Sequence, residues 1–132
     1  MQLTLEADYA VRIVYVLGIL GEKTDAKSIS EKAGVTLRFS LKILRKLVAA
    51  GIVRSYKGTQ GGYELAKPPE EISLLEVIET VEGPIRLNRC TASEFICTRP
   101  KAEPCAFQKV FNELSIMVRE HLDKSKFDQF LG

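Results

Sequence analysis

Three cysteines, Cys90, Cys97 and Cys105, are gathered in one short stretch of a chain that contains no other cysteine. Prolines interrupt this stretch, which is also too polar for a core strand, so we expect it to form a loop. Thiolates are ligands of iron-sulfur clusters and of zinc, whereas an odd number of cysteines suits a disulfide framework poorly. Residues 84–106 are therefore predicted to hold a metal or redox-thiol site. Because the stretch has no C-x-x-C pair, three unrelated free cysteines remain an alternative.

The composition is typical of a small globular protein. With 132 residues, of which 45% are hydrophobic, the chain fits one domain plus appendages and can bury a modest core. Its first apolar run follows the acidic residues Glu6 and Asp8, which is unlike a signal peptide. The longest apolar run, residues 10–20, contains Arg12 and is too short to span a bilayer. We expect a cytoplasmic protein without a membrane segment, whose thiols stay reduced.

The positive charge is concentrated in one part of the chain. The net charge is only +2, yet no acidic residue occurs between Glu31 and Glu64. The basic residues of that stretch are Lys32, Arg38, Lys42, Arg45, Lys46, Arg54 and Lys57. A solvated surface usually mixes both signs, so this asymmetry indicates a polyanionic partner such as nucleic acid.

The elements around this basic stretch predict a helix-turn-helix. The spacing of apolar residues indicates a buried helix over residues 8–20, ending near Gly21, and a short helix over residues 25–34. A third helix is predicted over residues 37–51, with Thr36 as its N-cap. Two helices, a glycine-containing turn and a basic third helix form the arrangement that places the third helix in the major groove of DNA.

The third helix is predicted to have two different faces. Four leucines and a valine form the face that is expected to pack on the core: Leu37, Leu41, Leu44, Leu47 and Val48. Basic residues form the opposite face. Because the N-terminal part of a recognition helix enters the groove most deeply, Arg38, Ser40 and Lys42 are predicted near base edges or adjacent phosphates. Arg45 and Lys46 are expected to contact phosphates.

The residues after the third helix predict a β-hairpin wing over residues 52–66. Two strand-like runs flank the sequence "GTQGG", whose glycines permit the backbone conformations of a tight turn. Such a wing can place Lys57, Thr59 or Gln60 against the DNA backbone or in the minor groove. Each pattern alone is weak evidence. The order of helix-turn-helix and wing along the chain, with no acidic residue from Lys32 to Tyr63, favours double-stranded DNA as the partner.

The C-terminal part of the chain is predicted to form a homodimer. Apolar residues at intervals of three and four define a helix with one buried stripe: Phe107, Val110, Phe111, Leu114, Met117, Val118 and Leu122. This helix could pack on its own domain, but a small winged module offers limited surface, so we expect a second copy to cover it. The recognition helices of the dimer would then meet successive major grooves, about 34 Å apart.

These elements define a fold class that is mainly α with a small β-hairpin. A winged helix-turn-helix DNA-binding domain is predicted over residues 1–83. The cysteine loop follows over residues 84–106. Residues 107–132 are expected to form a long C-terminal dimerisation helix and a tail.

Three segments resemble bacterial winged-helix regulators of the IscR, NsrR and RirA type, and most of all the IscR members. They are "LTLEADYAVRIV" near the N-terminus, "GTQGGYELAKPPEEISLLEVIETVEG" at residues 58–83, and the three cysteines before the last helix. The resemblance covers nearly the whole chain. It implies a homodimer with an iron-sulfur cluster in each subunit, of the 2Fe-2S rather than the 4Fe-4S type, and DNA affinity that changes with cluster state. It also implies control of genes for iron-sulfur cluster assembly.

The resemblance further implies that Cys90, Cys97 and Cys105 are cluster ligands, although their spacing is wider than is typical of IscR. IscR-like proteins carry a histidine three residues after the third cysteine, where this chain has Gln108, a poor iron ligand. NsrR-like proteins carry an aspartate at the place of Asp8, which is therefore the candidate fourth ligand, supplied by the other subunit. A carboxylate in the first turn of a helix is also stabilised there without any ligand role.

Other functions stay open at this point. A structural zinc site or a redox-thiol site would use the same cysteines, and a nitric oxide or iron sensor of the same family would use the same cluster. An enzyme with a small-molecule substrate is not expected. The sequence has no glycine-rich phosphate loop and no Ser-His-Asp set, and its single histidine, His121, falls in the apolar stripe of the last helix.

Overall fold

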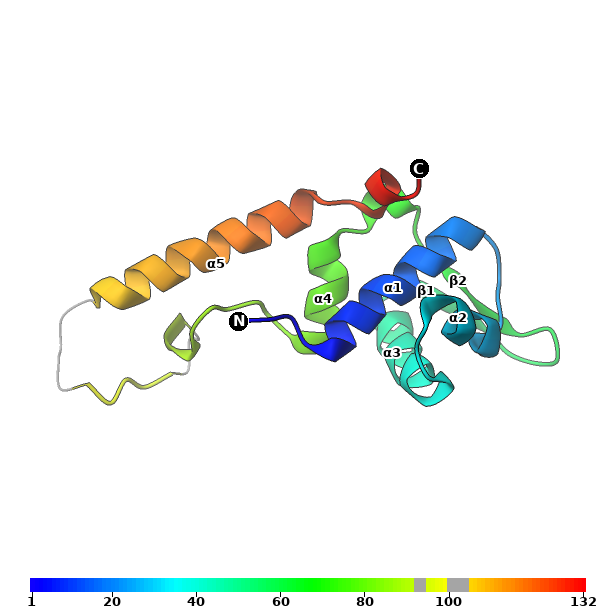
Figure 1. The fold of residues 1–132 in the computed structure, drawn as a ribbon, viewed down its shortest axis with the longest axis horizontal. Coiled ribbons are helices and arrows are strands. Elements are labelled where there is room, and N and C mark those ends of the chain that lie inside the picture. Colours follow the sequence, from blue (N-terminus) through cyan, green and yellow to red (C-terminus); the bar gives the residue numbers. More distant parts are fainter. Residues whose placement is uncertain (92–94, 100–104) are drawn as a thin grey trace.

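The chain folds mainly into helices, with one small β-hairpin (Figure 1). The computed structural model describes residues 1–91, 95–99 and 105–132, so parts of the predicted cysteine loop lie outside the described residues. The elements are α1 (Leu5–Leu20), α2 (Ala26–Ala33), α3 (Leu37–Ala49), β1 (Val53–Tyr56), β2 (Gly62–Leu65), η1 (Pro69–Glu71), α4 (Leu74–Glu82), η2 (Arg89–Thr91), α5 (Ala106–Lys124) and η3 (Phe127–Phe130). This order confirms the predicted fold class. None of the helices formed by the described residues is long and apolar enough to cross a membrane.

Polar N-caps and a glycine C-cap set the ends of the first three helices. The hydroxyl of Thr36 accepts a hydrogen bond from a backbone N–H in the first turn of α3, so this helix begins where the sequence predicts. Gly34 ends α2 with a φ of 69°, a left-handed conformation that glycine adopts without steric cost. Helix α1 begins at Leu5 rather than at the predicted Asp8, because the hydroxyl of Thr4 caps it.

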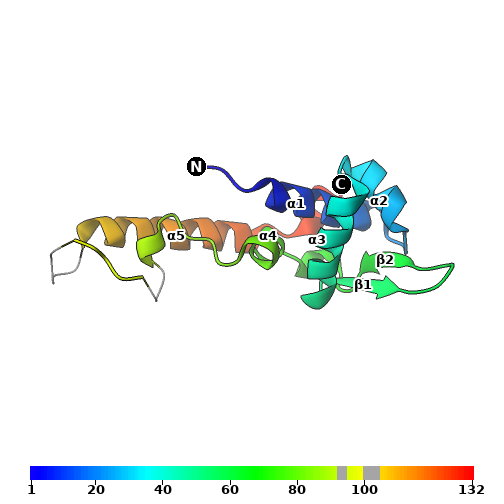
Figure 2. The ribbon, with the colours of Figure 1, turned by 90° about the horizontal axis from the view of Figure 1, so that it is seen from below.

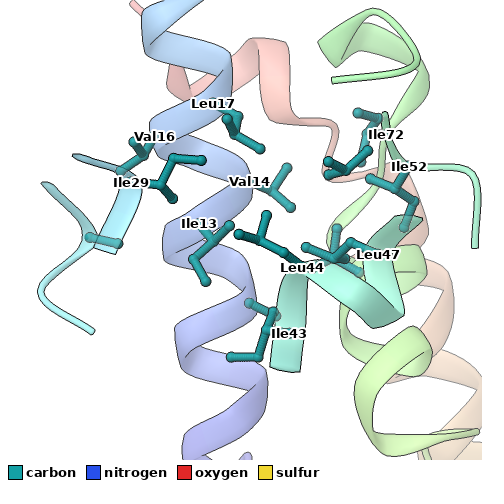
Figure 3. Packing of buried hydrophobic residues seen from close by; sticks show 14 of the residues in the cluster. Ile13, Val14, Val16, Leu17, Ile29, Ile43, Leu44, Leu47, Ile52 and Ile72 are labelled. Atoms are coloured by element: carbon teal, nitrogen blue, oxygen red, sulfur yellow. The ribbon is translucent and has the colours of Figure 1, made fainter. Parts of the chain in front are cut away.

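The core lies where α1 crosses α2 and α3, and the residues after β2 close it (Figure 3). The largest fully buried aliphatic side chains come from α1, α2, α3, α4 and the segments around β1 and η1: Ile13, Val14, Leu17, Ile29, Ile43, Leu44, Leu47, Ile52, Val53, Ile72 and Ile78. Burying such a side chain contributes about 1.5–3 kcal/mol to folding. This packing holds α3 in a fixed orientation on α1, with its basic side turned outward.

The β-hairpin has the predicted position and a glycine-dependent turn. Gly58 has a φ of 97°, and a Cβ atom at Gly61 would lie 2.5 Å from the carbonyl oxygen of Tyr56, so a side chain at Gly61 would clash. Tyr63 of β2 exchanges two backbone hydrogen bonds of 2.8 and 2.9 Å with Thr24 in the loop between α1 and α2. Strand β2 of the wing is therefore fixed to the helical domain, and the turn beyond it projects (Figure 2).

Helix α5 projects away from the winged domain, and η2 lies beside it (Figures 1 and 2). The chain after α5 returns to the core. Phe127 is buried there, and its N–H donates to the carbonyl of Ile72 at 3.0 Å. The tail, which the sequence prediction groups with the dimerisation helix, thus packs on the winged domain. Helical periodicity could not reveal this, because the tail lies beyond the end of the helix.

Contacts between α4 and α5 fix the angle at which α5 leaves the domain. The carboxylate of Glu79 accepts hydrogen bonds from the guanidinium of Arg119 at 2.9 and 3.1 Å and from the N–H of Ile85 at 2.8 Å. The hydrogen bond from Arg119 holds the pKa of Glu79 below its usual range. The hydroxyl of Ser115 accepts a hydrogen bond from the N–H of Leu87 at 3.0 Å. These contacts connect the winged domain to the helix that carries the apolar stripe.

Candidate DNA interface and cysteine pocket

The outward side of α3 is a basic, solvent-exposed surface. Arg38, Lys42 and Arg45 are all exposed, as their predicted role in DNA binding requires. Together with three apolar neighbours they line a hollow of about 900 Å³: Leu37, Arg38, Phe39, Leu41, Lys42 and Arg45. We call this set the α3 surface.

Two of the predicted DNA-contacting residues do not fit this surface. Ser40 is fully buried, and its hydroxyl has no hydrogen-bond partner within the described part of the chain, so the expectation that it lies near a base edge is wrong for this conformation. The ammonium group of Lys46 lies 2.7 Å from the carboxylate of Glu6 and is half-buried, so it is already paired within the chain. Both residues are less exposed than the sequence analysis predicts.

The buried face of α3 also differs from the predicted one. Leu37 and Leu41 are predicted to pack on the core, but their exposed fractions are 45% and 38%. The side chains that α3 buries are Ser40, Ile43, Leu44 and Leu47. This arc is rotated by about 65° around the helix from the predicted one. The exposed leucines beside the basic residues are a feature that sequence periodicity missed.

The predicted wing residues are exposed at the tip of the hairpin. Lys57, Thr59 and Gln60 lie between β1 and β2 and are all accessible to a partner. Their access agrees with the expected contact to the DNA backbone or minor groove, which stays a prediction.

The three cysteines line a single pocket of about 400 Å³ between the η2 segment and the first turns of α5. Cys97 is exposed, whereas Cys90 and Cys105 are half-buried. The aromatic rings of Phe95 and Phe107 form part of the wall. The sequence prediction anticipated the cysteines but not this aromatic lining, because the two rings lie far apart in the sequence.

Polar groups around the pocket stabilise thiolate charge. The backbone N–H of Gln108, at the start of α5, is the main cause that lowers the pKa of the Cys105 thiol, and the N–H of Phe107 and the guanidinium of Arg99 add to it. Arg99 Nη1 donates to Cys105 Sγ at 2.7 Å, and the N–H of Arg99 donates to Cys97 Sγ at 3.4 Å. These contacts therefore favour the thiolate of Cys105, the form in which cysteine binds metals.

The donor set fits an iron-sulfur cluster in chemistry, but the three thiols are spread around the pocket. Within residues 1–91, 95–99 and 105–132, no three Cys, His, Asp or Glu side chains are grouped closely enough to hold a metal ion. Gln108, which occupies the place of the expected histidine, lines the pocket and donates through Nε2 to the carbonyl of Cys90 at 2.6 Å. Binding one cluster would require the thiols of Cys90, Cys97 and Cys105 to lie closer together than they do in this structure.

The candidate fourth ligand, Asp8, lies elsewhere in the chain. Its carboxylate pairs with Arg12 at 2.7 Å, and both side chains are about half exposed. Among the described residues that line the cysteine pocket, none comes from α1. Asp8 therefore does not belong to the cysteine pocket of its own chain. His121, the single histidine, is exposed on α5.

The apolar stripe of α5 has little contact with its own chain. Its exposed members, at 38–66% accessibility, are Phe107, Val110, Leu114, Met117 and Val118. Of the side chains described on α5, only that of Ser115 is buried. A helix that exposes such a stripe in one chain is suited to bury it against another.

Comparison with known proteins places this geometry in a family. Residues 3–132 match the Rrf2 family, described as an iron-dependent transcriptional regulator. Two Mycobacterium tuberculosis proteins, MT1325 and Rv1287, are 36% identical over 87 residues, which is 64% of this chain and 54% of theirs. The match thus spans about half the length of these relatives. NsrR, an HTH-type transcriptional regulator of Bacillus subtilis, is 28% identical over 127 residues, covering 94% of this chain and 86% of NsrR.

Solved structures share the fold over almost the full chain. IscR of T. potens superposes with a TM-score of 0.79 at 23% identity, covering 99% of this chain and 86% of IscR. An oxidized form of Staphylococcus aureus CymR superposes with a TM-score of 0.76 at 26% identity, covering 99% of this chain and 96% of CymR. The homologues are transcriptional regulators and not enzymes. With its winged helix-turn-helix fold and its match over residues 3–132, this chain belongs to the Rrf2 family of transcriptional regulators.

Proposed function

We propose that this chain is a cytoplasmic, homodimeric regulator whose affinity for an operator in double-stranded DNA is controlled by an iron-sulfur cluster. The observation that carries the proposal is that Cys90, Cys97 and Cys105 line one pocket directly before α5. Their thiolates would hold the cluster, of the 2Fe-2S rather than the 4Fe-4S type. When bound, such a cluster supplies a centre that responds to iron supply, oxygen or nitric oxide. The proposed targets are genes for iron-sulfur cluster assembly.

The position of Cys105 gives the proposed site a route to the DNA-binding surface. Cys105 is the N-cap residue of α5, so any movement of its thiolate acts on the start of that helix. Helix α5 is tied to α4 by the Glu79–Arg119 pair, and α4 packs on α1 and α3. The angle between the two winged domains of a dimer would then follow the state of the cysteine segment. By linkage, the favoured operator must strengthen cluster retention to the same degree.

Anaerobic purification tests the proposal directly. Freshly purified protein is expected to be brown, with visible absorption and with iron and sulfide in similar amounts. The protein is also expected to elute as a dimer. A colourless protein that contains zinc would instead support a structural zinc site on the same three cysteines.

A second candidate function is a thiol redox switch. It is favoured by the contact between Arg99 and Cys105 Sγ and by the structural similarity to the oxidized form of CymR. In this case hydrogen peroxide would oxidise two thiols to a disulfide and be reduced to two water molecules. Metal-free protein that loses two free thiols per chain after peroxide treatment, with a matching change in DNA affinity, would favour this function over the cluster.

Substitutions in α3 and in the wing are expected to change DNA affinity in different ways. Arg38→Ala is expected to cost about 1–3 kcal/mol on the specific site if Arg38 contacts a guanine. Lys57→Ala is expected to weaken all sequences similarly and to lower the slope of log K against log salt by about one. Titrations of fluorescent duplexes at several salt concentrations measure both effects. Lys109→Ala, an exposed lysine on α5, is the matched control and should change neither.

The proposed role of Asp8 as the fourth cluster ligand can be tested by substitution. Asp8→Ala is expected to leave the fold and the dimer intact but to give an altered cluster that decays faster in air, because an iron atom would lose its oxygen ligand. The visible spectrum and its lifetime after exposure to air measure this. Arg12→Ala removes the partner of Asp8 but not the carboxylate, so it should retain the cluster spectrum. An unchanged spectrum and lifetime in Asp8→Ala would direct attention to Gln108, His121 or an external thiol.

A further inference from the structure

Leu41 is an exposed aliphatic residue in the middle of a surface that is otherwise basic. It lies about 60° around α3 from Arg38 and about 40° from Arg45. Both of these arginines are exposed. Leu41 lines the hollow of the α3 surface and also a second hollow of about 200 Å³, which α3 forms with Ser55 and Tyr63 of the hairpin. The Leu41 side chain therefore lies at the edge of α3 that faces the wing.

Burial in the core does not explain why a leucine occupies this position. The buried arc of α3 is complete with Ser40, Ile43, Leu44 and Leu47, and Leu41 lies outside it. Phe39 is a contrasting case, because its ring packs edge-on against Tyr9 at 5.7 Å and lies under the ammonium group of Lys42 at 5.8 Å. Phe39 thus has partners in its own chain that account for its position.

The positive charge around Leu41 indicates which class of molecule contacts it. No acidic residue occurs between Lys32 and Tyr63, so a second copy of this surface would bring arginines and lysines against one another. A DNA major groove offers phosphates to those cations and, on its floor, one exposed apolar group: the 5-methyl group of thymine. An aliphatic side chain flanked by cations matches that combination.

We propose that Leu41 reads the 5-methyl group of a thymine in the major groove, so that the operator contains a required thymine in each half-site. This inference rests on the proposed DNA binding but not on the iron-sulfur cluster. Leu41 acts as a specificity-determining residue beside Arg38, which supplies the polar contact to a neighbouring base. The arginines and lysines would set affinity for any duplex, and the leucine would set a base preference.

Replacement of thymine by uracil tests the proposal, since it removes the methyl group and leaves base pairing unchanged. Anaerobically purified full-length protein first selects its sites from a random duplex pool. Each thymine of a selected site is then replaced by uracil, one at a time. One position per half-site is expected to lose about three- to fivefold in affinity, the loss for one methyl group removed from an apolar contact. Leu41→Ala should lose a similar factor on the thymine duplex and should bind the thymine and uracil duplexes equally.

Ile19→Ala is the matched control, because it shortens another exposed aliphatic side chain, on α1 and outside the α3 surface, and should keep the discrimination at that position. Since Leu41 is exposed, its alanine variant is expected to keep the circular dichroism and dimer state of the parent. The inference is overturned if no uracil substitution changes the affinity, or if Leu41→Ala still distinguishes the two duplexes. Failure of the parent protein to bind any selected duplex is a different result, which overturns the proposed DNA binding as well.

Discussion

Replacement of any one of the three cysteines by alanine is expected to abolish cluster binding. Cys90, Cys97 and Cys105 line the same pocket, and each would supply one thiolate. Two remaining thiolates cannot complete a four-ligand iron-sulfur site, and a weak oxygen ligand would not compensate. The expected result is a colourless protein that has lost its visible absorption, iron and sulfide. Its DNA affinity should no longer respond to the conditions that load or remove the cluster of the parent protein.

Ile96→Ala is the control for this prediction. Ile96 lies next to Cys97 in the sequence and is 86% exposed, and it is not among the described residues that line the pocket. Its variant should keep the parent spectrum. If a cysteine variant instead keeps the full iron and sulfide content, that cysteine is not a ligand. If the variants lose zinc rather than iron, the pocket holds a structural metal.

Replacement of Leu114 by glutamate is expected to convert the proposed dimer to a monomer. Leu114 lies at the centre of the exposed stripe of α5, between Val110 and Val118. In the proposed dimer each copy would bury this position, and an unpaired carboxylate in an apolar interface is strongly unfavourable. The variant should elute as a monomer in size-exclusion chromatography with light scattering. Its DNA affinity should fall to that of a single winged domain, because the two half-sites are no longer read together.

Asn112→Glu is the matched control, since it adds the same charge to the same helix. Asn112 is exposed about 160° around α5 from Leu114, on the side opposite the stripe. This variant should remain dimeric. A Leu114→Glu protein that is still a dimer with parent DNA affinity would show that α5 does not form the interface. In that case the exposed stripe would need another partner.

Local interactions made a large part of the fold predictable from the sequence. Thr36 caps α3 and Gly34 ends α2 through contacts that reach only a few residues along the chain. The turn of the wing also depends on local geometry. Gly58 has a positive φ, which side chains disfavour, and a Cβ atom at Gly61 would lie too close to the backbone of Tyr56. The stripe of α5 followed from helical periodicity. The clustering of basic residues between Glu31 and Glu64 indicated the basic side of α3 before any geometry.

Features that depend on contacts between distant segments were decided by the tertiary structure. The leucines and the valine of α3 span too broad an arc to define one buried face. The helices packed against α3 select Ser40 and Ile43 for burial and leave Leu41 partly exposed. The return of Phe127 to the core likewise depends on a backbone hydrogen bond to Ile72. Sequence periodicity fixes the relative angles of side chains on a helix, but only the neighbouring elements determine which side of that helix is covered.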